Sequence, residues 1–359
     1  MMWQANAITN RLQVKWPILQ AGMAGGTTTP ELVAAVSEAG GLGTLGAGYM
    51  SAGQMRDAIR AIRARTDKPF AVNLFIPESC DGSQPVAESV SSVMNEVRER
   101  LGIPADPEVT RFAEPFEEQM AVVFEEQVPV FSFTFGVLEK RWLAELKQRG
   151  IITIGTATTV REAIALEASG VDMIAAQGSE GGGHRGSFLP DSPSNLIGTM
   201  ALVPQIVDRV DIPVIAAGGI MDGRGIAAAF ALGAQAVQLG TAFLTCVESG
   251  AHPQYKRSVR ETSDEATVIT RAFSGKSARG IENEFMTLLA PHDHELPPYP
   301  VQNALTRDIR NAAAKQDRTE YLSMWAGQAA SLSREMSAGE LVASLVEETE
   351  RVCQGLLKK

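Results

Sequence analysis

The stretch "PVIAAGGIMDGRGIAAAFALGAQAVQLGT", residues 213–241, contains one complete strand–turn–helix–strand unit. Its first apolar run ends in two glycines, a helical segment begins near Gly223, and the second apolar run ends in "LGT". Both runs are apolar throughout, as in parallel strands that are covered on both faces, whereas strands with one solvated face alternate. The stretch therefore predicts a parallel sheet with helices packed on it, which is an α/β fold.

The same rhythm of apolar run, turn and helical segment recurs along the first 250 residues. The helical segments carry capping signals, such as Thr29 before Pro30 and a glycine stop at Gly40. The predicted strands cover residues 17–20, 42–46, 70–75, 129–135, 151–155, 172–177, 213–219 and 236–241. Eight such units are the number of a (β/α)8, or TIM, barrel. A doubly wound sheet is the alternative, and the regularity of the units makes it the weaker one.

Two segments depart from this rhythm. Residues 76–127 are polar, punctuated by proline and mostly helical in pattern, so they are expected to form an insertion above the barrel rim. No strand signal appears after about residue 250, and the remainder is expected to be mostly helical. We therefore expect residues 1–250 to form the barrel with its insertion. Residues 251–359 are expected to pack with the insertion as a second, smaller, mostly helical domain.

The composition excludes several classes of function. The chain of 359 residues has a formal net charge of −10, which argues against a nucleic acid or an anionic membrane as partner. No apolar run approaches the roughly eighteen residues that span a bilayer. The N-terminal residues lack the basic-then-apolar order of a signal peptide, so a cytoplasmic location is expected.

Metal sites are not indicated. The three cysteines, Cys80, Cys246 and Cys353, are far apart and form no CxxC pair. His292 and His294 lie in "APHDHELPPYP", where an HxDH spacing could bind a metal, but a proline-rich surface loop is the favoured interpretation. We therefore expect no metal.

A phosphate site is indicated by the turns after the last two predicted strands. Gly218 and Gly219 end one strand just before the helix near Gly223, and Gly240 and Thr241 end the next strand. TIM barrels build phosphate sites at this place from backbone N–H groups and a helix N-terminus. Tight turns without a ligand are the alternative, and the match of both loops favours the phosphate.

Amide side chains stand near the C-terminal ends of four apolar strands: Gln20, Asn73, Gln177 and Gln238. An amide in an apolar strand needs hydrogen-bond partners or it costs stability. Amides offer both donors and acceptors, which suits the edge of a planar heteroaromatic ring such as a flavin. Pairing between neighbouring strands explains any single amide, but four at one end favour a bound ring system.

The loop "AAQGSEGGGHRGSF", residues 175–188, combines Gln177 with three consecutive glycines and His184. Glycine runs often mark close approach of another group to the backbone, and histidine can exchange a proton near neutral pH. We expect the glycines to give clearance to a flat cofactor and His184 to face the group that reacts with it.

Six segments of the chain resemble a known protein family. The segments "PILQAGMAGG", "FAVNLF", "AAQGSEGGGHRGSF", "PVIAAGGIMDGRGIAAAFALGAQAVQLGTAFL", "YPVQNALT" and "MWAGQ" are similar, in this order along nearly the whole chain, to nitronate monooxygenases, formerly called 2-nitropropane dioxygenases. The resemblance implies a TIM barrel with a second helical domain and FMN as cofactor, without a metal. The FMN contacts that it implies, together with the glycines inferred above, fall on Ala21, Gly22, Met23, Asn73, Gln177, Gly182, Gly183, Gly218, Gly219, Gln238, Leu239, Gly240 and Thr241.

The resemblance also implies an activity. Such enzymes oxidise alkyl nitronates, including propionate 3-nitronate, with molecular oxygen to a carbonyl compound and nitrite or nitrate. His184 corresponds to the family histidine, which serves as general base where a neutral nitroalkane must lose its α-proton. With a substrate that is already deprotonated, His184 is expected only to bind the anion. The expected partners are the small-molecule substrate and O2, and a homo-oligomer is left open.

Two positions depart from the pattern of the relatives. Thr134 in "SFTFG" replaces a second histidine, and the glycine loop has "SEGGGH" where "PEAGGH" is more usual. Both changes leave the predicted flavin site intact and put the identity of the substrate in doubt. Tyr299 in "PPYP" either reaches the pocket or is held aside by the prolines around it.

Other functions remain as alternatives. A flavin-dependent enoyl-thioester (acyl-carrier-protein) reductase shares the barrel and the GGH loop, and an NADH:quinone reductase could use the same scaffold. An IMP dehydrogenase-like enzyme needs a nucleophilic cysteine in the loop after the sixth strand, which has none. A non-enzymatic FMN- or phosphate-binding protein is disfavoured by His184 and the ring of amides.

Overall fold

A computed structural model describes residues 3–78, 85–189 and 196–357, so Cys80 lies outside the described residues. Eight strands form one parallel sheet in the order β1-β9-β8-β6-β5-β4-β3-β2, and a bridge between Leu19 and Leu42 joins its two edges. The strands are β1 (Ile18–Gln20), β2 (Gly43–Gly46), β3 (Phe70–Phe75), β4 (Val130–Thr134), β5 (Ile152–Ala157), β6 (Met173–Gln177), β8 (Val214–Ala217) and β9 (Ala236–Leu239). This confirms the predicted TIM barrel, and each strand lies within two residues of its predicted bounds.

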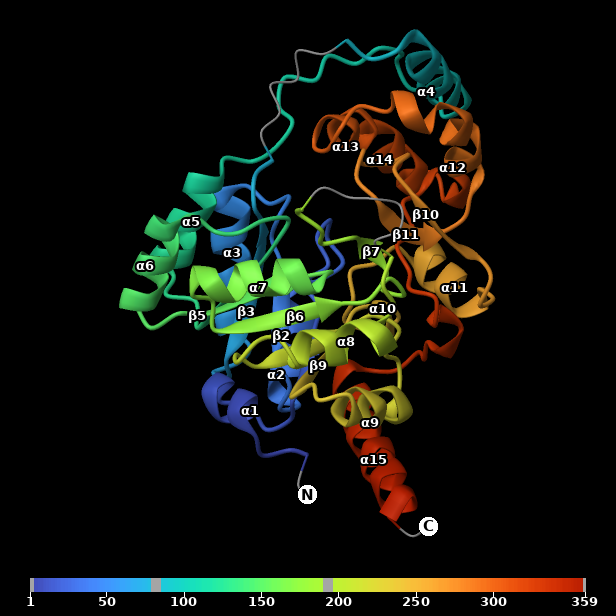
Figure 1. Ribbon diagram of the computed structural model, residues 1–359. Coiled ribbons are helices and arrows are strands. Elements are labelled where there is room, and N and C mark those ends of the chain that lie inside the picture. Colours follow the sequence, from blue (N-terminus) through green and yellow to red (C-terminus); the bar gives the residue numbers. More distant parts are fainter. Residues whose placement is uncertain (1–2, 79–84, 190–195, 358–359) are drawn as a thin grey trace.

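Helices surround the barrel in the expected alternation (Figure 1). They are α2 (Pro30–Glu38), α3 (Ala52–Arg63), α6 (Lys140–Gln148), α7 (Val160–Ser169), α8 (Thr199–Val207), α9 (Gly223–Ala231) and the four-residue α10 (Thr241–Leu244). Helix α1 (Ala7–Leu12) closes the N-terminal end of the barrel, where Ile8 and Leu12 pack on Leu19 and Leu42. The predicted cap of α2 is present, since the Thr29 side chain accepts a hydrogen bond from the Leu32 amide.

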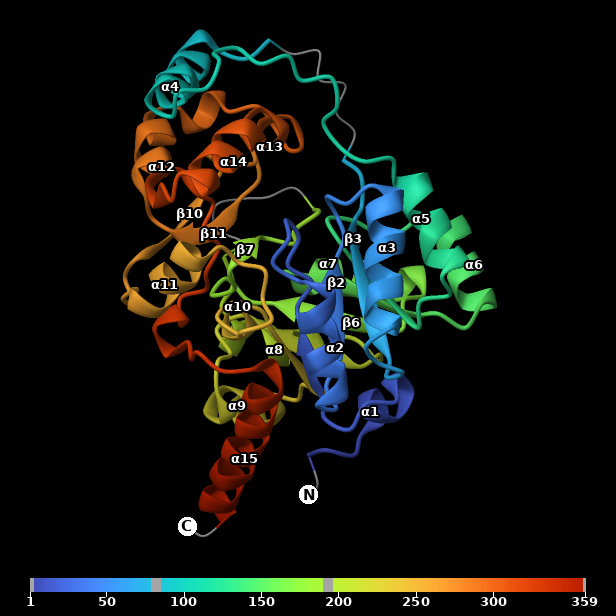
Figure 2. The ribbon, with the colours of Figure 1, turned by 180° about the vertical axis from the view of Figure 1, so that it is seen from behind.

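A second hydrophobic core lies on the other side of the barrel rim, and we call its elements the helical lobe. The helical lobe consists of α4 (Glu88–Arg100), α11 (Pro253–Glu261), α12 (Glu284–Leu289), α13 (Val301–Leu305), α14 (Arg307–Lys315) and the short helices η1 (Ala290–Glu295), η2 (Thr319–Tyr321) and η3 (Ala330–Leu332). Figure 2 shows α4 lying on α12 although the two are far apart in sequence. Arg98 of α4 is 2% exposed and donates to Asp308 at 2.8 Å and to the Leu305 carbonyl at 2.7 Å.

Two strands lie in the region after residue 250, where the sequence shows no strand signal. Strands β10 (Thr267–Thr270) and β11 (Ala278–Ile281) lie in this region, and β11 pairs with β7 (Gly183–His184) of the barrel loop. Each strand is only two to four residues long, and "ARGI" has little β propensity of its own. The tertiary pairing therefore decides this small sheet, and it joins the loop that carries His184 to the helical lobe.

One helix of the insertion and one helix of the C-terminal segment also contact the barrel. Helix α5 (Phe116–Glu125), from the insertion, packs on α3. The C-terminal helix α15 (Ala338–Leu357) packs on α9 and α2, away from the helical lobe (Figure 1). We propose a division of the chain by these contacts, in which the barrel includes α5 and α15 and the smaller domain is the helical lobe.

Candidate active site

A cavity of about 490 Å³ lies at the C-terminal ends of the barrel strands, where the helical lobe faces them. This is the end at which TIM barrels place their active sites. Register brings the site residues together, because Gln177 pairs with Ala217, Ala217 with Gln238, and Gly46 with Asn73. Residues from distant parts of the chain therefore meet at one rim.

The cavity collects nearly all the residues singled out from the sequence. Its lining includes Ala21, Gly22, Met23, Asn73, Gln177, Gly182, Gly183, His184, Gly218, Gly219, Gln238, Gly240 and Thr241. Among the predicted FMN contacts, Leu239 is the exception, since its side chain is 1% exposed and belongs to the hydrophobic core. What each lining residue binds stays a prediction.

The four amides of the strand ends have different surroundings. Gln20 lies outside the cavity lining, and its Oε1 accepts from the Thr44 amide at 3.0 Å, so pairing between neighbouring strands accounts for it. Asn73 donates to Ser132 at 2.9 Å and keeps its oxygen unpartnered. Gln238 makes no side-chain hydrogen bond to any described residue. Asn73 and Gln238 therefore each keep at least one polar side-chain atom without a partner in the described chain, available to a ligand.

Gln177 holds the glycine loop against strand β6. Its Nε2 donates to the His184 carbonyl at 2.9 Å, and its Oε1 accepts from the Gly186 amide at 2.8 Å. The predicted role of Gln177 at a ring edge is thereby reduced to one remaining N–H and one remaining lone pair. Its visible contribution is to fix the loop that carries His184.

One glycine of this loop is in close contact with another part of the chain. A side chain at Gly182 would lie 2.6 Å from the backbone of Ala326 and Gly327, so another part of the chain packs on this glycine. Gly183 has φ +77, a conformation that favours glycine. Ala326 and Gly327 therefore occupy the space that a side chain at position 182 would need.

The two predicted phosphate turns present unpaired backbone donors. Gly218 and Gly219 have φ of +105 and +72, which turns the chain sharply at the end of β8. The amides of Gly219, Gly240 and Thr241 donate to no backbone or side-chain group among the described residues, and all three residues line the cavity. These N–H groups line the cavity without a partner in the described chain, so these turns fit an anion such as a phosphate.

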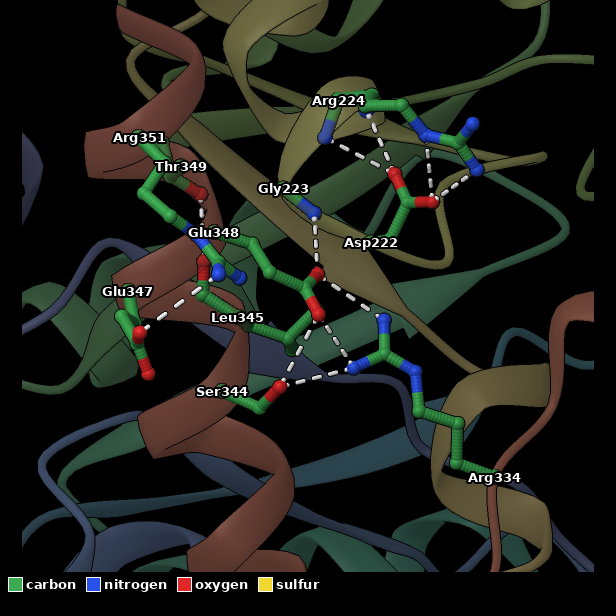
Figure 3. Close-up of polar contacts among 11 residues, drawn as sticks. Asp222, Gly223, Arg224, Arg334, Ser344, Leu345, Glu347, Glu348, Thr349 and Arg351 are labelled. Carbon is green, nitrogen blue, oxygen red and sulfur yellow. Dashed lines mark hydrogen bonds and ion pairs between the residues drawn. The ribbon is translucent and has the colours of Figure 1, made fainter. Parts of the chain in front are cut away.

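Helix α9 does not contribute its N-terminus to that site, which corrects the expectation for the helix near Gly223. The Gly223 amide donates to Glu348 at 3.1 Å, and the amides of Arg224 and Gly225 donate to Asp222 at 2.9 and 3.3 Å (Figure 3). Glu348 belongs to α15 and is held by Arg334 through bonds of 2.6 and 3.0 Å. The protein's own carboxylates thus occupy the first turn of α9.

His184 lies in the cavity wall with one ring nitrogen engaged. Its Nε2 is 2.8 Å from the Ser274 hydroxyl, while its Nδ1 has no partner among the described residues. The rings of Phe135, Tyr299 and Trp325 surround it, with centroids 5.8, 5.9 and 5.5 Å away. Burial, followed by the charges of Lys276 and Arg310, lowers the pKa of His184 to about 3. The imidazole is therefore neutral at physiological pH.

The sequence left the roles of Thr134 and Tyr299 open. Thr134 lines the cavity and its hydroxyl lies 3.4 Å from that of Thr156 on the next strand. Tyr299 is 7% exposed and lies outside the cavity lining, with its ring edge-on to those of His184 and Phe135. Tyr299 therefore supports the wall behind His184.

The helical lobe adds cavity residues that the sequence did not reveal: Tyr255, Asn303, Arg310, Ser323 and Trp325. Tyr49, after strand β2, also lines the cavity. Only the "YPVQNALT" and "MWAGQ" segments pointed toward this wall. The sequence does not mark Arg310 as a cavity residue, because a charged residue on an amphipathic helix ordinarily faces solvent.

Neither a metal site nor a membrane span is found in the described part of the chain. No group of three or more metal-binding side chains occurs in residues 3–78, 85–189 and 196–357. No described helix is long and apolar enough to cross a bilayer.

Comparison with known proteins gives consistent results. The family model of nitronate monooxygenase matches residues 6–348. A probable nitronate monooxygenase of Staphylococcus haemolyticus is 47% identical over 352 residues, covering 97% of this chain and 98% of the relative. Its counterpart in Staphylococcus saprophyticus is 46% identical over 347 residues, covering 96% and 98%.

Solved structures agree. A nitroalkane oxidase from Streptomyces ansochromogenes superimposes with a TM-score of 0.88 at 40% identity, covering 98% of this chain and 100% of that one. FabK from Thermotoga maritima follows with a TM-score of 0.79 at 34% identity, covering 99% of both chains. With the family model spanning almost the full length, and relatives this similar over nearly their whole chains, the protein belongs to the nitronate monooxygenase family of oxidoreductases.

Proposed function

We propose that this protein uses FMN and molecular oxygen to oxidise alkyl nitronates, including propionate 3-nitronate, to a carbonyl compound and nitrite or nitrate. The observation that carries the proposal is a neutral histidine set in an aromatic cavity that unpaired backbone amides also line. The proposed place of action is the cytoplasm.

The residues present fit FMN. The unpaired amides of Gly219, Gly240 and Thr241 would hold its phosphate, with Gly218 setting the turn. The free amide groups of Asn73 and Gln238 would meet polar edges of the ring system. The segment Ala21–Met23 lines the same cavity and would lie along the ring with its backbone. When bound, FMN supplies the electron acceptor that the side chains of this chain lack.

His184 has the protonation state that a base requires. Its unpartnered Nδ1 is the atom we assign to the substrate: with a neutral nitroalkane, the α-C–H bond breaks and the proton forms an N–H bond at Nδ1. A group with a pKa of about 3 is a weak base at neutral pH. We therefore infer that nitronates, which need no proton transfer, are better substrates than neutral nitroalkanes.

The aromatic wall around His184 would limit the access of water to the reacting atoms. Phe135 and Trp325 pack around His184, and Phe75 packs on Phe135 with ring centroids 4.8 Å apart. A dry site strengthens every polar interaction within it and limits side reactions with solvent.

A reductase is the second candidate, because FabK matches this chain over 99% of its length. On this scaffold it would be a flavin-dependent enoyl-thioester reductase or an NADH:quinone reductase. Such an enzyme would require a pyridine nucleotide to reduce the flavin, whereas the proposed reaction requires none.

Oxygen consumption separates the two candidates. The purified, FMN-loaded protein is mixed with propionate 3-nitronate and, separately, with NADH, with the FMN-free protein as control. Rapid uptake with the nitronate alone, with release of nitrite or nitrate, is expected. Absence of uptake with the nitronate, together with bleaching of the flavin by NADH, would instead establish a reductase.

A further inference from the structure

Arg310 is the single arginine or lysine among the described residues that line the cavity. It comes from α14 of the helical lobe and makes no ion pair with any described carboxylate. A guanidinium stays charged in proteins, and a charge removed from water without a partner costs several kcal/mol, on the order of a whole domain's stability. An uncompensated cation in a cavity wall therefore calls for an anion that enters the cavity.

The protein orients this guanidinium without neutralising it. Nη2 donates to the carbonyl oxygen and the side-chain oxygen of Asn303, at 2.6 and 3.0 Å, and Nε donates to the Thr306 carbonyl at 3.3 Å. All of these acceptors are uncharged. The two N–H groups of Nη1 donate to no described residue, which leaves them for a ligand.

Another arginine of the same lobe shows the contrasting arrangement. Arg98 is more deeply buried, and the fold gives its guanidinium the carboxylate of Asp308, the side chain of Asn95 and a backbone carbonyl. All three of its nitrogens are engaged. A purely structural guanidinium in this fold is thus paired, and Arg310 is not.

Tyr49 also lines the cavity, and its phenol does not neutralise Arg310. Its hydroxyl is buried and has no hydrogen bond of normal geometry, although it interacts with the neighbouring Tyr299 hydroxyl. Burial raises the pKa of Tyr49, against the opposing effect of Arg310, so the phenol keeps its proton. The two free N–H groups of Arg310 are therefore the charged donors that this part of the cavity wall offers to a carboxylate.

The other cations nearby are not available. Lys276 pairs with Glu78 at 2.5 Å, lies 4.7 Å above the Phe135 ring and is outside the cavity lining. Arg307 is exposed and outside the lining as well.

We propose that Arg310 binds the carboxylate of propionate 3-nitronate and so sets the preference of this protein for that substrate over nitronates without a carboxylate. The inference rests on the proposed function. The residues assigned to FMN belong to the barrel, whereas Arg310 belongs to the helical lobe that faces it. A substrate between them presents its nitronate end toward the barrel and its carboxylate toward α14.

The test compares two nitronates, the dianion propionate 3-nitronate and the monoanion ethyl nitronate. In Arg310→Met, which removes the charge and keeps much of the length, the ratio of kcat/KM for propionate 3-nitronate to that for ethyl nitronate is expected to fall at least about tenfold, the usual effect of a charged hydrogen bond. Arg310→Lys is expected to recover part of the ratio. Arg307→Met is the matched control and is expected to leave the ratio within about twofold of the wild type.

An unchanged ratio in Arg310→Met, whether or not both rates fall, would overturn the proposal while nitronate oxidation itself stands. Unfolding is excluded by checking that the FMN content and the melting temperature match those of Arg307→Met. If the wild type oxidises neither nitronate, the proposed function fails, and inert anions then decide on Arg310. Succinate, whose two carboxylates have the same spacing as the charges of propionate 3-nitronate, should bind more tightly than butyrate to the wild type and equally weakly to Arg310→Met. Equal binding of succinate by both proteins would overturn the carboxylate site.

Discussion

The Nε2 atom of His184 lies 2.8 Å from the hydroxyl oxygen of Ser274, which joins a barrel loop to the helical lobe. Ser274 is 1% exposed, and its hydroxyl also lies 3.1 Å from the Lys276 carbonyl and 3.3 Å from the Lys276 amide. A hydroxyl with one proton and two lone pairs satisfies all these contacts when it accepts from Nε2–H and donates to the carbonyl. This arrangement leaves Nδ1 unprotonated, as the base role requires.

Replacing Ser274 tests that positioning. Ser274→Ala is expected to lower kcat for neutral nitroethane by about tenfold, because the imidazole loses the contact that fixes its tautomer. Turnover of ethyl nitronate should change less, and Ser274→Thr should restore much of the loss. Steady-state kinetics at matched FMN content provide the measurement. A loss of the same size on both substrates would argue for a merely structural hydroxyl.

Replacing His184 tests the base directly. His184→Asn is expected to lower the oxidation of neutral nitroalkanes by about 10²–10⁴-fold, the usual contribution of a general base. Nitronates arrive deprotonated and should retain much of their rate. Oxygen uptake with nitroethane and with ethyl nitronate at unchanged flavin content distinguishes the two. Equal loss on both would count against proton abstraction.

The buried neutral His184 also predicts a dependence of stability on pH. Its pKa is lowered from 6.5 to about 3, so the unfolded chain binds a proton below pH 6.5 that the folded protein does not. Folding therefore loses stability as the pH falls from 6.5 toward 3, by roughly 2 kcal/mol at pH 5 from this group alone. His184→Asn, which does not titrate, should show a smaller drop in melting temperature between pH 7 and pH 5 than the wild type. Identical drops in the two proteins would show that His184 is protonated in the fold.

The contact between α15 and α9 predicts a role for Glu348 in stability. Glu348→Ala leaves the Gly223 amide without its acceptor and Arg334 without its carboxylate, and it should cost about 2–4 kcal/mol. The neighbouring Glu347 is exposed, and its carboxylate lies 3.8 Å from the Arg351 guanidinium, which is a weak surface ion pair (Figure 3). The matched control Glu347→Ala should therefore change the free energy of unfolding by less than about 0.5 kcal/mol. Urea unfolding of both variants is the measurement. Similar midpoints for the two would contradict the inferred contribution.

The barrel could be predicted from the sequence because each strand is an uninterrupted apolar run between helices with clear caps. Likewise, Asn73 and Gln238 could be predicted to line one cavity, because the carboxyl ends of parallel strands share one rim. The gathering of cavity residues follows from the topology once eight units are recognised.

The rest depends on contacts between segments far apart in sequence. The acceptor for the Gly223 amide is Glu348, 125 residues later, and a helix N-terminus read in isolation gives no sign that it is occupied. Likewise, strand β7 consists of Gly183 and His184, which have little β propensity of their own. The two residues form a strand because they pair with β11. Arg310 differs from other helical arginines only in what it faces, which the sequence does not contain.

The pairing of β7 with β11 has a consequence for assembly and for engineering. A fragment ending at residue 250 would carry every residue assigned to FMN, yet it would lack β11 and Ser274, the groups that hold His184 in place. Such a fragment is expected to be coloured by the cofactor but unable to abstract a proton from neutral nitroalkanes. For the same reason, proton abstraction becomes possible during folding only after the helical lobe has docked on the barrel.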